Sequence, residues 1–312
     1  MRNAIILNPS AGNGRCLRRW NKQRATLRDI YGPIKYCPTQ GPGHATRLAR
    51  SLLEDGIDHI ISGGGDGTHF EVINGWFNED TPINPLARLT VLPMGTGSDL
   101  ARSLGIAPGL RGLEPLRFGH SLQADVGKVT CLSPEDNAPT TCYFLNMGRI
   151  GMGAVACRYV NEHSKTMGGL LSYLRAVILS LCTYRDAAIA ISIDGRPMIE
   201  GLTKDFSIAK GRFDAGGMLM APHARLDNGL FDCYHIGPIG FLDALRSLPK
   251  LYAGRMSERR DVVKYLRATQ IHAESTERVA IEVDGEFIGY LPVTVSLLPG
   301  VLPLTCVHDA PR

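Results

Sequence analysis

The sequence of 312 residues contains no apolar run long enough to cross a bilayer. Its longest charge-free helical stretch, residues 176–184, is far shorter than the roughly 18–20 residues that a spanning helix needs. The first apolar run is too short for a signal peptide and is followed at once by Asn8 and Pro9. We therefore expect a cytoplasmic chain that does not cross a membrane.

Paired or clustered cysteines are also missing. Eight cysteines are scattered along the chain, no CxxC pair occurs, and no His/Cys cluster has zinc-site spacing. Most of the cysteines lie within apolar runs, as is typical of small buried hydrophobic residues. This pattern favours reduced cysteines in the cytoplasm and argues against a zinc site.

Two common nucleotide-binding motifs are absent, because the chain has neither a P-loop sequence nor GxGxxG. The net charge is only +4, yet the charges are unevenly distributed. Residues 2–28 include seven basic side chains and no acid, and residues 250–267 include six basic side chains against two acids. Such patches suit the phosphates of a nucleotide or of anionic lipids, although solvated helix faces would explain them equally well.

The first 125 residues repeat one pattern four times: an apolar run, a small polar loop and a helical pattern. The four apolar runs are residues 4–7, 34–37, 59–62 and 89–92. Repeated strand–loop–helix units predict parallel strands with right-handed crossovers. The loops should then converge on the edge formed by the carboxyl ends of the strands.

The pattern changes after about Val126. Short β-prone segments separated by Gly, Pro and Asp turns predict an antiparallel β domain, with helical insertions near 168–184 and 239–254. Asp194-Gly195 and Asp284-Gly285 are each flanked by alternating apolar residues, which indicates hairpins. A last apolar run is expected to return to the first domain. We expect one domain at 1–125 plus about 300–312 and another at 126–299.

Two glycine-rich loops are the main candidates for chemistry. The string from Ser62 to Thr68, SGGGDGT, combines glycines that allow close approach to an anion with a helix start that favours phosphate. An acid among such donors makes sense if Asp66 orients a metal or the attacking hydroxyl; the alternative is a simple helix cap. In the second loop, residues 93–99, Thr96 is a candidate donor to a phosphate or ribose.

These motifs resemble the diacylglycerol kinase catalytic-domain family, which includes bacterial diacylglycerol kinases, YegS/BmrU-type lipid kinases, sphingosine kinases and ceramide kinases. The resemblance rests on three ordered segments, NPSAG at 8–12, GGDGT at 64–68 and PMGT at 93–96. Later segments at 209–217, 221–230 and 283–286 resemble the second-domain signature of the same family. GGDGT alone is shared with NAD kinases and resembles a phosphofructokinase loop.

The resemblance implies an α/β nucleotide-binding domain with a parallel sheet, of the NAD kinase/phosphofructokinase type, and a β-sandwich second domain. It implies ATP as the cofactor, and Glu286 matches the residue proposed as general base in soluble bacterial diacylglycerol kinases. In sphingosine kinases that role falls to the residue matching Asp66. We favour Glu286 as base and Asp66 as metal or substrate orienter. The implied ATP-binding residues are Asn8, Pro9, Ser10, Gly12, Thr39, Gly64, Gly65, Gly67, Thr68, Glu71, Gly95 and Thr96.

Two positions depart from the family pattern. Ser98 stands where the family usually has Asn, so a side-chain amide is missing there. The segment Leu226-Asp227-Asn228-Gly229 stands where the family commonly has Leu-Asp-Asp-Gly, so a Mg²⁺ bound there would lose one negative charge. The candidate metal ligands are Asp227, Asn228 and Asp284.

The leading interpretation is a lipid kinase that uses ATP and Mg²⁺ to phosphorylate a diacylglycerol, sphingoid, ceramide or phosphatidylglycerol hydroxyl. We expect it to be peripheral at the inner face of the membrane, with no nucleic-acid partner and with a homodimer possible. Segment 239–254 and the basic stretch 250–267 are candidates for the membrane contact, but a core-packed helix with a solvated end is a simpler interpretation. The alternatives are a kinase of NAD or a sugar, or a nucleotide-binding regulator with weak or no turnover.

Overall fold

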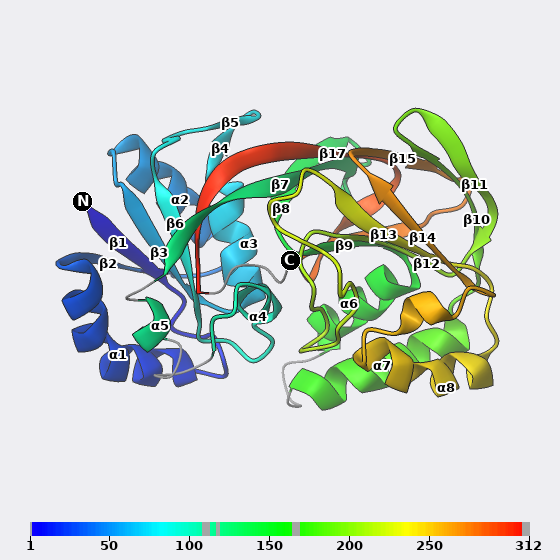
Figure 1. Ribbon diagram of the computed structural model, residues 1–312, viewed down its shortest axis with the longest axis horizontal. Helices are drawn as coiled ribbons and strands as arrows, with labels where there is room; N and C mark the ends of the chain where they lie inside the picture. The colour runs from blue at the N-terminus through cyan, green and yellow to red at the C-terminus, as the bar shows by residue number, and fades with distance from the viewer. Residues whose placement is uncertain (1, 108–112, 117–118, 164–168, 308–312) are drawn as a thin grey trace. The chain divides into compact units, whose positions relative to one another are not determined.

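The computed structural model describes residues 2–107, 113–116, 119–163 and 169–307 (Figure 1). The chain divides into two compact units, Met1–Val126 with Leu298–Arg312, and Gly127–Leu297. It passes from the first unit to the second within β7 (His120–Leu132) and returns within β17 (Glu286–Cys306). Each unit is described by itself.

The first unit is built on a parallel sheet with the strand order β17-β6-β3-β1-β2, in which β17 contributes its carboxyl-terminal end. Residues Ala4 to Leu7 are completely buried, as expected for a strand covered on both faces. The strands are β1 (Asn3–Leu7), β2 (Ile34–Pro38), β3 (His59–Gly64) and β6 (Arg88–Pro93), with a small ribbon of β4 (Phe77–Asn78) and β5 (Thr81–Pro82). The predicted parallel core is therefore confirmed.

The strands β1, β2, β3 and β6 each lead into a helix that begins beyond the carboxyl end of the strand. The helices are α1 (Arg15–Tyr31), α2 (His44–Glu54), α3 (Asp66–Asn74) and α4 (Asp99–Ser103), and α5 (Leu113–Leu116) follows. From β1 the chain runs to β2 on one side and then to β3 on the other. The strand order thus reverses between β1 and β3, which is where open α/β sheets bind their ligands.

A buried relay of polar side chains crosses the first sheet. His59 Nδ1 lies 3.1 Å from Asn3 Oδ1, and His59 Nε2 lies 2.8 Å from Thr90 Oγ1. Thr90 Oγ1 in turn lies 2.7 Å from Thr305 Oγ1 on β17. Because buried polar groups need partners, this relay fixes the returning strand β17 against β6 at one register.

The second unit is an antiparallel β structure. One path of neighbouring strands runs β14-β13-β12-β9-β16-β17. A second path runs β17-β15-β10-β11, and β8 pairs with β7. Both predicted hairpins are present, with Asp194, Gly195, Asp284 and Gly285 all at positive φ, as a type I′ turn requires. The bounds are β8 (Pro139–Phe144), β9 (Met147–Gly151), β10 (Ala187–Ile193), β11 (Arg196–Thr203), β12 (Asp205–Ala209), β13 (Phe231–Ile236), β14 (Val263–Ala268), β15 (Gln270–Glu274) and β16 (Ala280–Val283).

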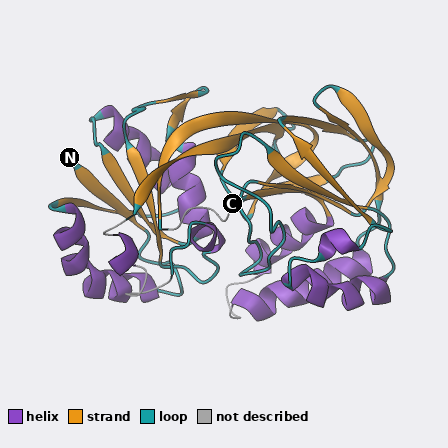
Figure 2. Cartoon of the chain, in the orientation of Figure 1, coloured by secondary structure: helices purple, strands orange, loops and turns teal. Residues whose placement is uncertain are grey.

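Three α-helices lie on one side of the strands of the second unit (Figure 2). They are α6 (Met152–His163), α7 (Gly169–Thr183) and α8 (Phe241–Tyr252), and a 3₁₀ turn, η2 (Met256–Glu258), follows α8. Helix α6 packs on α7, β9 and β16. Across the ranges described above, the structure contains no helix that combines the length and the apolar character needed to span a bilayer.

Candidate functional site

The carboxyl edge of the first sheet is a set of short loops whose glycines precede three helices. Gly14, Gly43 and Gly65 occupy the N-cap positions of α1, α2 and α3, and none of these caps has a side-chain hydrogen bond of its own. Gly14 and Gly43 have φ of 75° and 71°, which glycine adopts without strain. Helix N-termini of this kind attract anions through their amide groups and dipole.

Asn8 joins two of these loops at the point where the strand order reverses. Its Nδ2 donates to Thr68 Oγ1 at 3.1 Å, and its Oδ1 accepts the Ser10 N–H at 3.0 Å. Its own N–H donates to the Gly63 carbonyl at 2.9 Å. The loops after β1 and β3 therefore form one fixed corner, and the structure brings the predicted residues Asn8 and Thr68 together.

Other glycines are required because loop backbones touch one another. The N–H groups of Met94 and Gly95 both donate to the Gly64 carbonyl at 2.8 Å. A Cβ on Gly95 would lie 2.5 Å from Gly65 Cα, and one on Gly12 would lie 2.9 Å from the Met94 carbonyl oxygen. The sequence motif suggested that these glycines cradle phosphates, and the structure adds a packing reason for two of them, Gly12 and Gly95.

Asp66 holds the start of α4. One carboxylate oxygen accepts the Ser98 N–H at 2.7 Å, and the other accepts the Asp99 and Leu100 N–H groups at 3.0 and 3.4 Å. Asp66 also opens α3, so one carboxylate connects the loops after β3 and β6. The orienting role that we favour for Asp66 stays a prediction, and this capping role was not apparent from the motif.

Glu71 has a comparable role at α2. Its two carboxylate oxygens accept the N–H groups of Gly43 and Ala45 at 2.9 and 3.0 Å. The Thr46 hydroxyl donates to the Glu71 carbonyl at 2.9 Å, which adds a second link between α3 and α2. These contacts give Glu71 a function in positioning α2 beside the loops, whereas its assignment as an ATP-binding residue stays a prediction.

The remaining predicted ATP-binding residues lie on the same loops. The Thr39 N–H donates to the last carbonyl of β1 at 2.8 Å, so the loop after β2 lies beside the loop after β1. Ser10 and Thr96 are exposed, Pro9 is half-buried, and Gly67 lies in the first turn of α3. The hydroxyls of Ser10 and Thr96 are therefore accessible to a ligand.

Two arginines at the same edge were not singled out from the sequence. Arg15 Nε donates to the Gly12 carbonyl at 2.8 Å, and an Arg19 Nη donates to the Gly95 carbonyl at 3.3 Å. Their positive charges lie against two of the glycine loops, where they favour a phosphate. The signal in the sequence was the acid-free basic run of residues 2–28, which did not indicate which of its members reach the loops.

In the second unit, the hairpin that carries Glu286 is fixed from both sides. The buried Asp284 carboxylate accepts the N–H groups of residues 145–147, each at 2.9 Å. The Gly285 N–H donates to Glu282 at 3.0 Å. Glu286 opens β17 and is half-buried, so its backbone position is set by this turn.

Glu282 is a second acid close to this hairpin that the sequence did not reveal. It is buried beside Arg149, which also forms an ion pair with Asp214. Burial, and then the negative charge of Asp214, raise the pKa of Glu282 well above its usual range. Its surroundings therefore disfavour the ionised form of Glu282, and its buried carboxyl is poorly accessible to a substrate.

The segment proposed to bind Mg²⁺ is already occupied by protein cations. The buried Lys210 Nζ donates to Asn228 Oδ1 at 2.9 Å and to the Leu230 carbonyl at 2.8 Å. Asp227 forms an ion pair with Arg225 at 3.1 Å. No three His, Cys, Asp or Glu side chains converge to hold a metal within the portion of the chain that the structure describes. No ligand set for Mg²⁺ is therefore assigned, and Asp227, Asn228 and Asp284 remain predictions as ligands.

Comparison with known proteins identifies the family. Residues 2–129 match the diacylglycerol kinase catalytic domain, and residues 148–306 match the YegS C-terminal NAD kinase beta sandwich-like domain. The chain belongs to the diacylglycerol kinase family. Relatives of this chain named diacylglycerol kinase occur in Staphylococcus carnosus and Bacillus subtilis. The first is 26% identical over 289 residues, which cover 92% of this chain and 89% of the relative. The second is 27% identical over 294 residues, which cover 92% of this chain and 90% of the relative.

Solved structures agree with this family fold. A putative diacylglycerol kinase from Bacillus anthracis superposes with a TM-score of 0.77 at 24% identity, covering 99% of this chain and 97% of that chain. Yeast NADH kinase complexed with NADH superposes with a TM-score of 0.52 at 12% identity, covering 99% and 84%. The predicted family and the predicted combination of an NAD kinase-like α/β fold with a β-sandwich are thus confirmed.

Proposed function

We propose that this kinase-family member transfers the γ-phosphate of ATP to a hydroxyl of a membrane-derived lipid of the diacylglycerol, sphingoid, ceramide or phosphatidylglycerol type. The observation that carries the proposal is the fixed corner at the β1 and β3 carboxyl ends, where Asn8 binds Thr68. It lies at the reversal of strand order in a chain of the diacylglycerol kinase family. Relatives that align over about nine tenths of their length are named for the lipid reaction.

Features of the loops in the first unit support ATP binding there. The N-termini of α1 and α3 supply positive dipole ends, and Arg15 and Arg19 add charge at the Gly12 and Gly95 carbonyls. The exposed hydroxyls of Ser10 and Thr96 add donors for phosphate or ribose oxygens. Mg²⁺ supplies neutralisation of the phosphate charge during transfer in enzymes of this chemistry.

Glu286 is the proposed general base, and Asp66 is proposed to orient the metal or the acceptor hydroxyl. Phosphoryl transfer depends mainly on positioning and charge, with a carboxylate to accept the hydroxyl proton. Glu286 is half-buried on a rigid turn, whereas burial raises the pKa of its neighbour Glu282. Of these two acids, Glu286 is therefore the one whose side chain is more accessible to an acceptor hydroxyl.

The test is transfer of label from γ-labelled ATP to a panel of acceptors. Diacylglycerol, phosphatidylglycerol, sphingosine, ceramide, NAD and a hexose are each incubated with the purified protein, and an Asp66→Ala preparation made in parallel controls for contaminating kinases. Label in a lipid fraction that disappears with Asp66→Ala supports the proposal. Label in NADP or a sugar phosphate instead, or nucleotide binding with no transfer to any acceptor, would refute it.

A further inference from the structure

Helix α8 presents large apolar side chains to solvent. Phe241, Leu242, Leu245 and Tyr252 are 38%, 63%, 39% and 37% exposed. Of its twelve residues, all of them described, only Ser247 is buried. The sequence left open whether segment 239–254 packs in the core or contacts a membrane, and the exposure of these side chains contradicts a core-packed helix.

The exposed apolar residues share one face of the helix. At about 100° per residue, Phe241, Leu245 and Tyr252 fall within an arc of about 40°, and Leu242 widens it to about 100°. Ser247 and Leu251 project from the other side, where Leu251 packs against a buried methionine-rich cluster. Helix α8 therefore attaches to the unit through one narrow face and leaves an apolar stripe uncovered.

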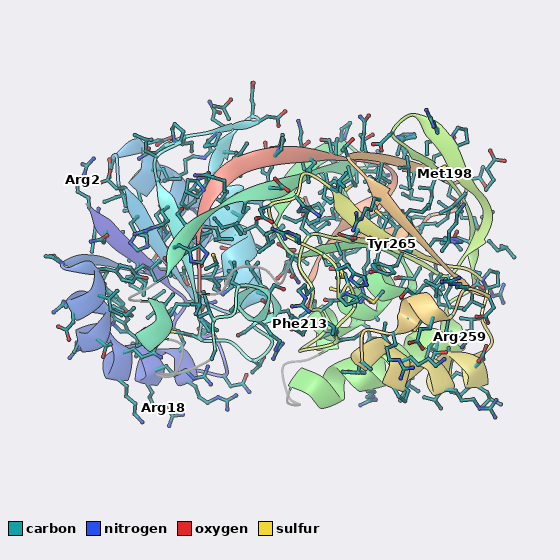
Figure 3. All side chains as sticks on the ribbon, in the orientation of Figure 1. Arg2, Arg18, Met198, Phe213, Arg259 and Tyr265 are labelled. Carbon is teal, nitrogen blue, oxygen red and sulfur yellow. The ribbon has the colours of Figure 1, made fainter. Side chains whose placement is uncertain are left out.

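The acids near this stripe are neutralised by arginines. Arg259 binds Asp243 at 2.8 Å and Asp261 at 2.7 Å, and Arg255 binds Glu258 at 2.7 Å. Figure 3 shows the labelled Arg259 beside α8. The arginine partners lower the pKa of Glu258 and of Asp261, so these ion pairs persist at neutral pH.

The remaining charge around the stripe is positive. Residues 241–261 contain five basic and three acidic side chains, which leaves a net charge of +2. Arg246 lies about 40° beyond the Leu242 edge of the stripe and Lys250 about 80° beyond it on the same side, and Arg260 lies beyond η2. An apolar stripe bordered by cations matches the interface of an anionic bilayer, in which acyl chains lie beneath phosphate groups.

We propose that α8 docks this protein on an anionic lipid bilayer, with its apolar stripe inserted at the headgroup level and Arg246 and Lys250 on lipid phosphates. The proposal rests on the proposed function, because a lipid hydroxyl is reached at a membrane surface. A second copy of the chain is a weaker partner, since two such surfaces would bring like charges together. Helix α8 is thus a docking element and is separate from the residues proposed for the chemistry.

Binding to vesicles tests the proposal directly. Wild-type protein should cosediment with vesicles of phosphatidylglycerol and phosphatidylcholine, and much less with pure phosphatidylcholine. Combined Leu242→Glu and Leu245→Glu should weaken binding at least about tenfold, because two apolar side chains no longer insert. Combined Arg246→Gln and Lys250→Gln should weaken binding to anionic vesicles about 30-fold, from about 1 kcal/mol per basic residue.

The matched control is Leu202→Glu on β11. Leu202 is 54% exposed in the same unit, and Figure 3 labels Met198 on the same strand, well separated from α8. Leu202→Glu should bind vesicles like wild type. Equal binding by wild type and the Leu242/Leu245 variant would overturn the proposal, as would wild-type binding that ignores lipid charge. A wild-type dimer that this variant converts to a monomer would assign the stripe to a second copy.

Two further measurements separate docking from catalysis and from unfolding. Phosphate transfer to a water-soluble short-chain diacylglycerol, without vesicles, should be unchanged in the α8 variants, whereas failure of the proposed function would abolish it in wild type as well. Leu242→Trp should show a blue-shifted emission on anionic vesicles, because the new indole enters the interface. An unshifted emission with a folded protein would refute insertion.

Discussion

Replacing Asp66 with Asn tests both roles of this carboxylate, the observed capping of α4 and the proposed role in catalysis. The side chain keeps its size but loses its charge and one acceptor oxygen. Of its three bonds to the start of α4, those to Ser98 and Asp99 have full hydrogen-bond lengths of 2.7 and 3.0 Å. Charge-assisted bonds contribute about 1.5–3 kcal/mol each and neutral ones about half as much. Asn loses one of the two bonds and makes the other neutral, so we expect the free energy of unfolding to fall by about 2–4.5 kcal/mol.

The rate of phosphate transfer should fall by much more than partial unfolding of the variant would cause. If Asp66 orients the metal or the attacking hydroxyl, Asp66→Asn should reduce transfer by about 100-fold or more under conditions where the variant is folded. Urea unfolding and label transfer from ATP are measured on the same preparation. Asp125→Asn is the matched control, because the buried Asp125 carboxylate accepts the Gly300 N–H at 2.9 Å in the same unit. Near-normal turnover by Asp66→Asn would show that its carboxylate is only a helix cap.

Three further predictions concern the base, a glycine and a buried histidine. Glu286→Gln cannot accept a proton and should lower kcat about 100-fold with an unchanged urea midpoint; an unaltered rate would place the base elsewhere. Gly95→Ala places a Cβ 2.5 Å from Gly65 Cα and should raise the KM for ATP several-fold. The control Gly41→Ala, whose Cβ would meet nothing within 4 Å, should leave the KM unchanged, and steady-state kinetics at varied ATP concentration test both. Burial lowers the pKa of His59 from 6.5 to about 3, so only the unfolded chain gains its proton as pH falls below 6.5. Going from pH 7.5 to 5.5 should therefore cost about 1.4 kcal/mol through His59, and urea titrations of His59→Asn should lack that part of the pH dependence.

The sheet of the first unit was predictable because its signals are local. Apolar runs followed by small polar loops and helical patterns recur four times, and parallel strands then place the loops at one edge. The glycine loops were predictable as well, because runs of glycine mark backbone conformations and close approaches that other residues do not allow. The pairing of Asp66 with α4 and of Glu71 with α2 joins groups 26 to 34 residues apart, and nothing in the local sequence specifies it.

Helix α8 illustrates a second limit. The spacing of Phe241, Leu245 and Tyr252 predicts a helix with an apolar stripe, and α8 begins and ends close to the expected segment. Periodicity defines the stripe but not what covers it, because a stripe facing the core and one facing solvent have the same spacing. The interaction of Lys210 with Asn228 was hidden for a similar reason, since the two residues meet only through the folded turn between β12 and β13.

The return of β17 to the first sheet has a consequence for synthesis on the ribosome. Leu304 pairs with Leu89, and Thr305 completes the polar relay through Thr90, so β6 remains an open sheet edge until residues near 304 have emerged. All of residues 127–297 are translated before that edge is closed. The nascent amino-terminal half must therefore wait with an unpaired strand, a state in which chaperones and neighbouring chains compete for the same backbone groups.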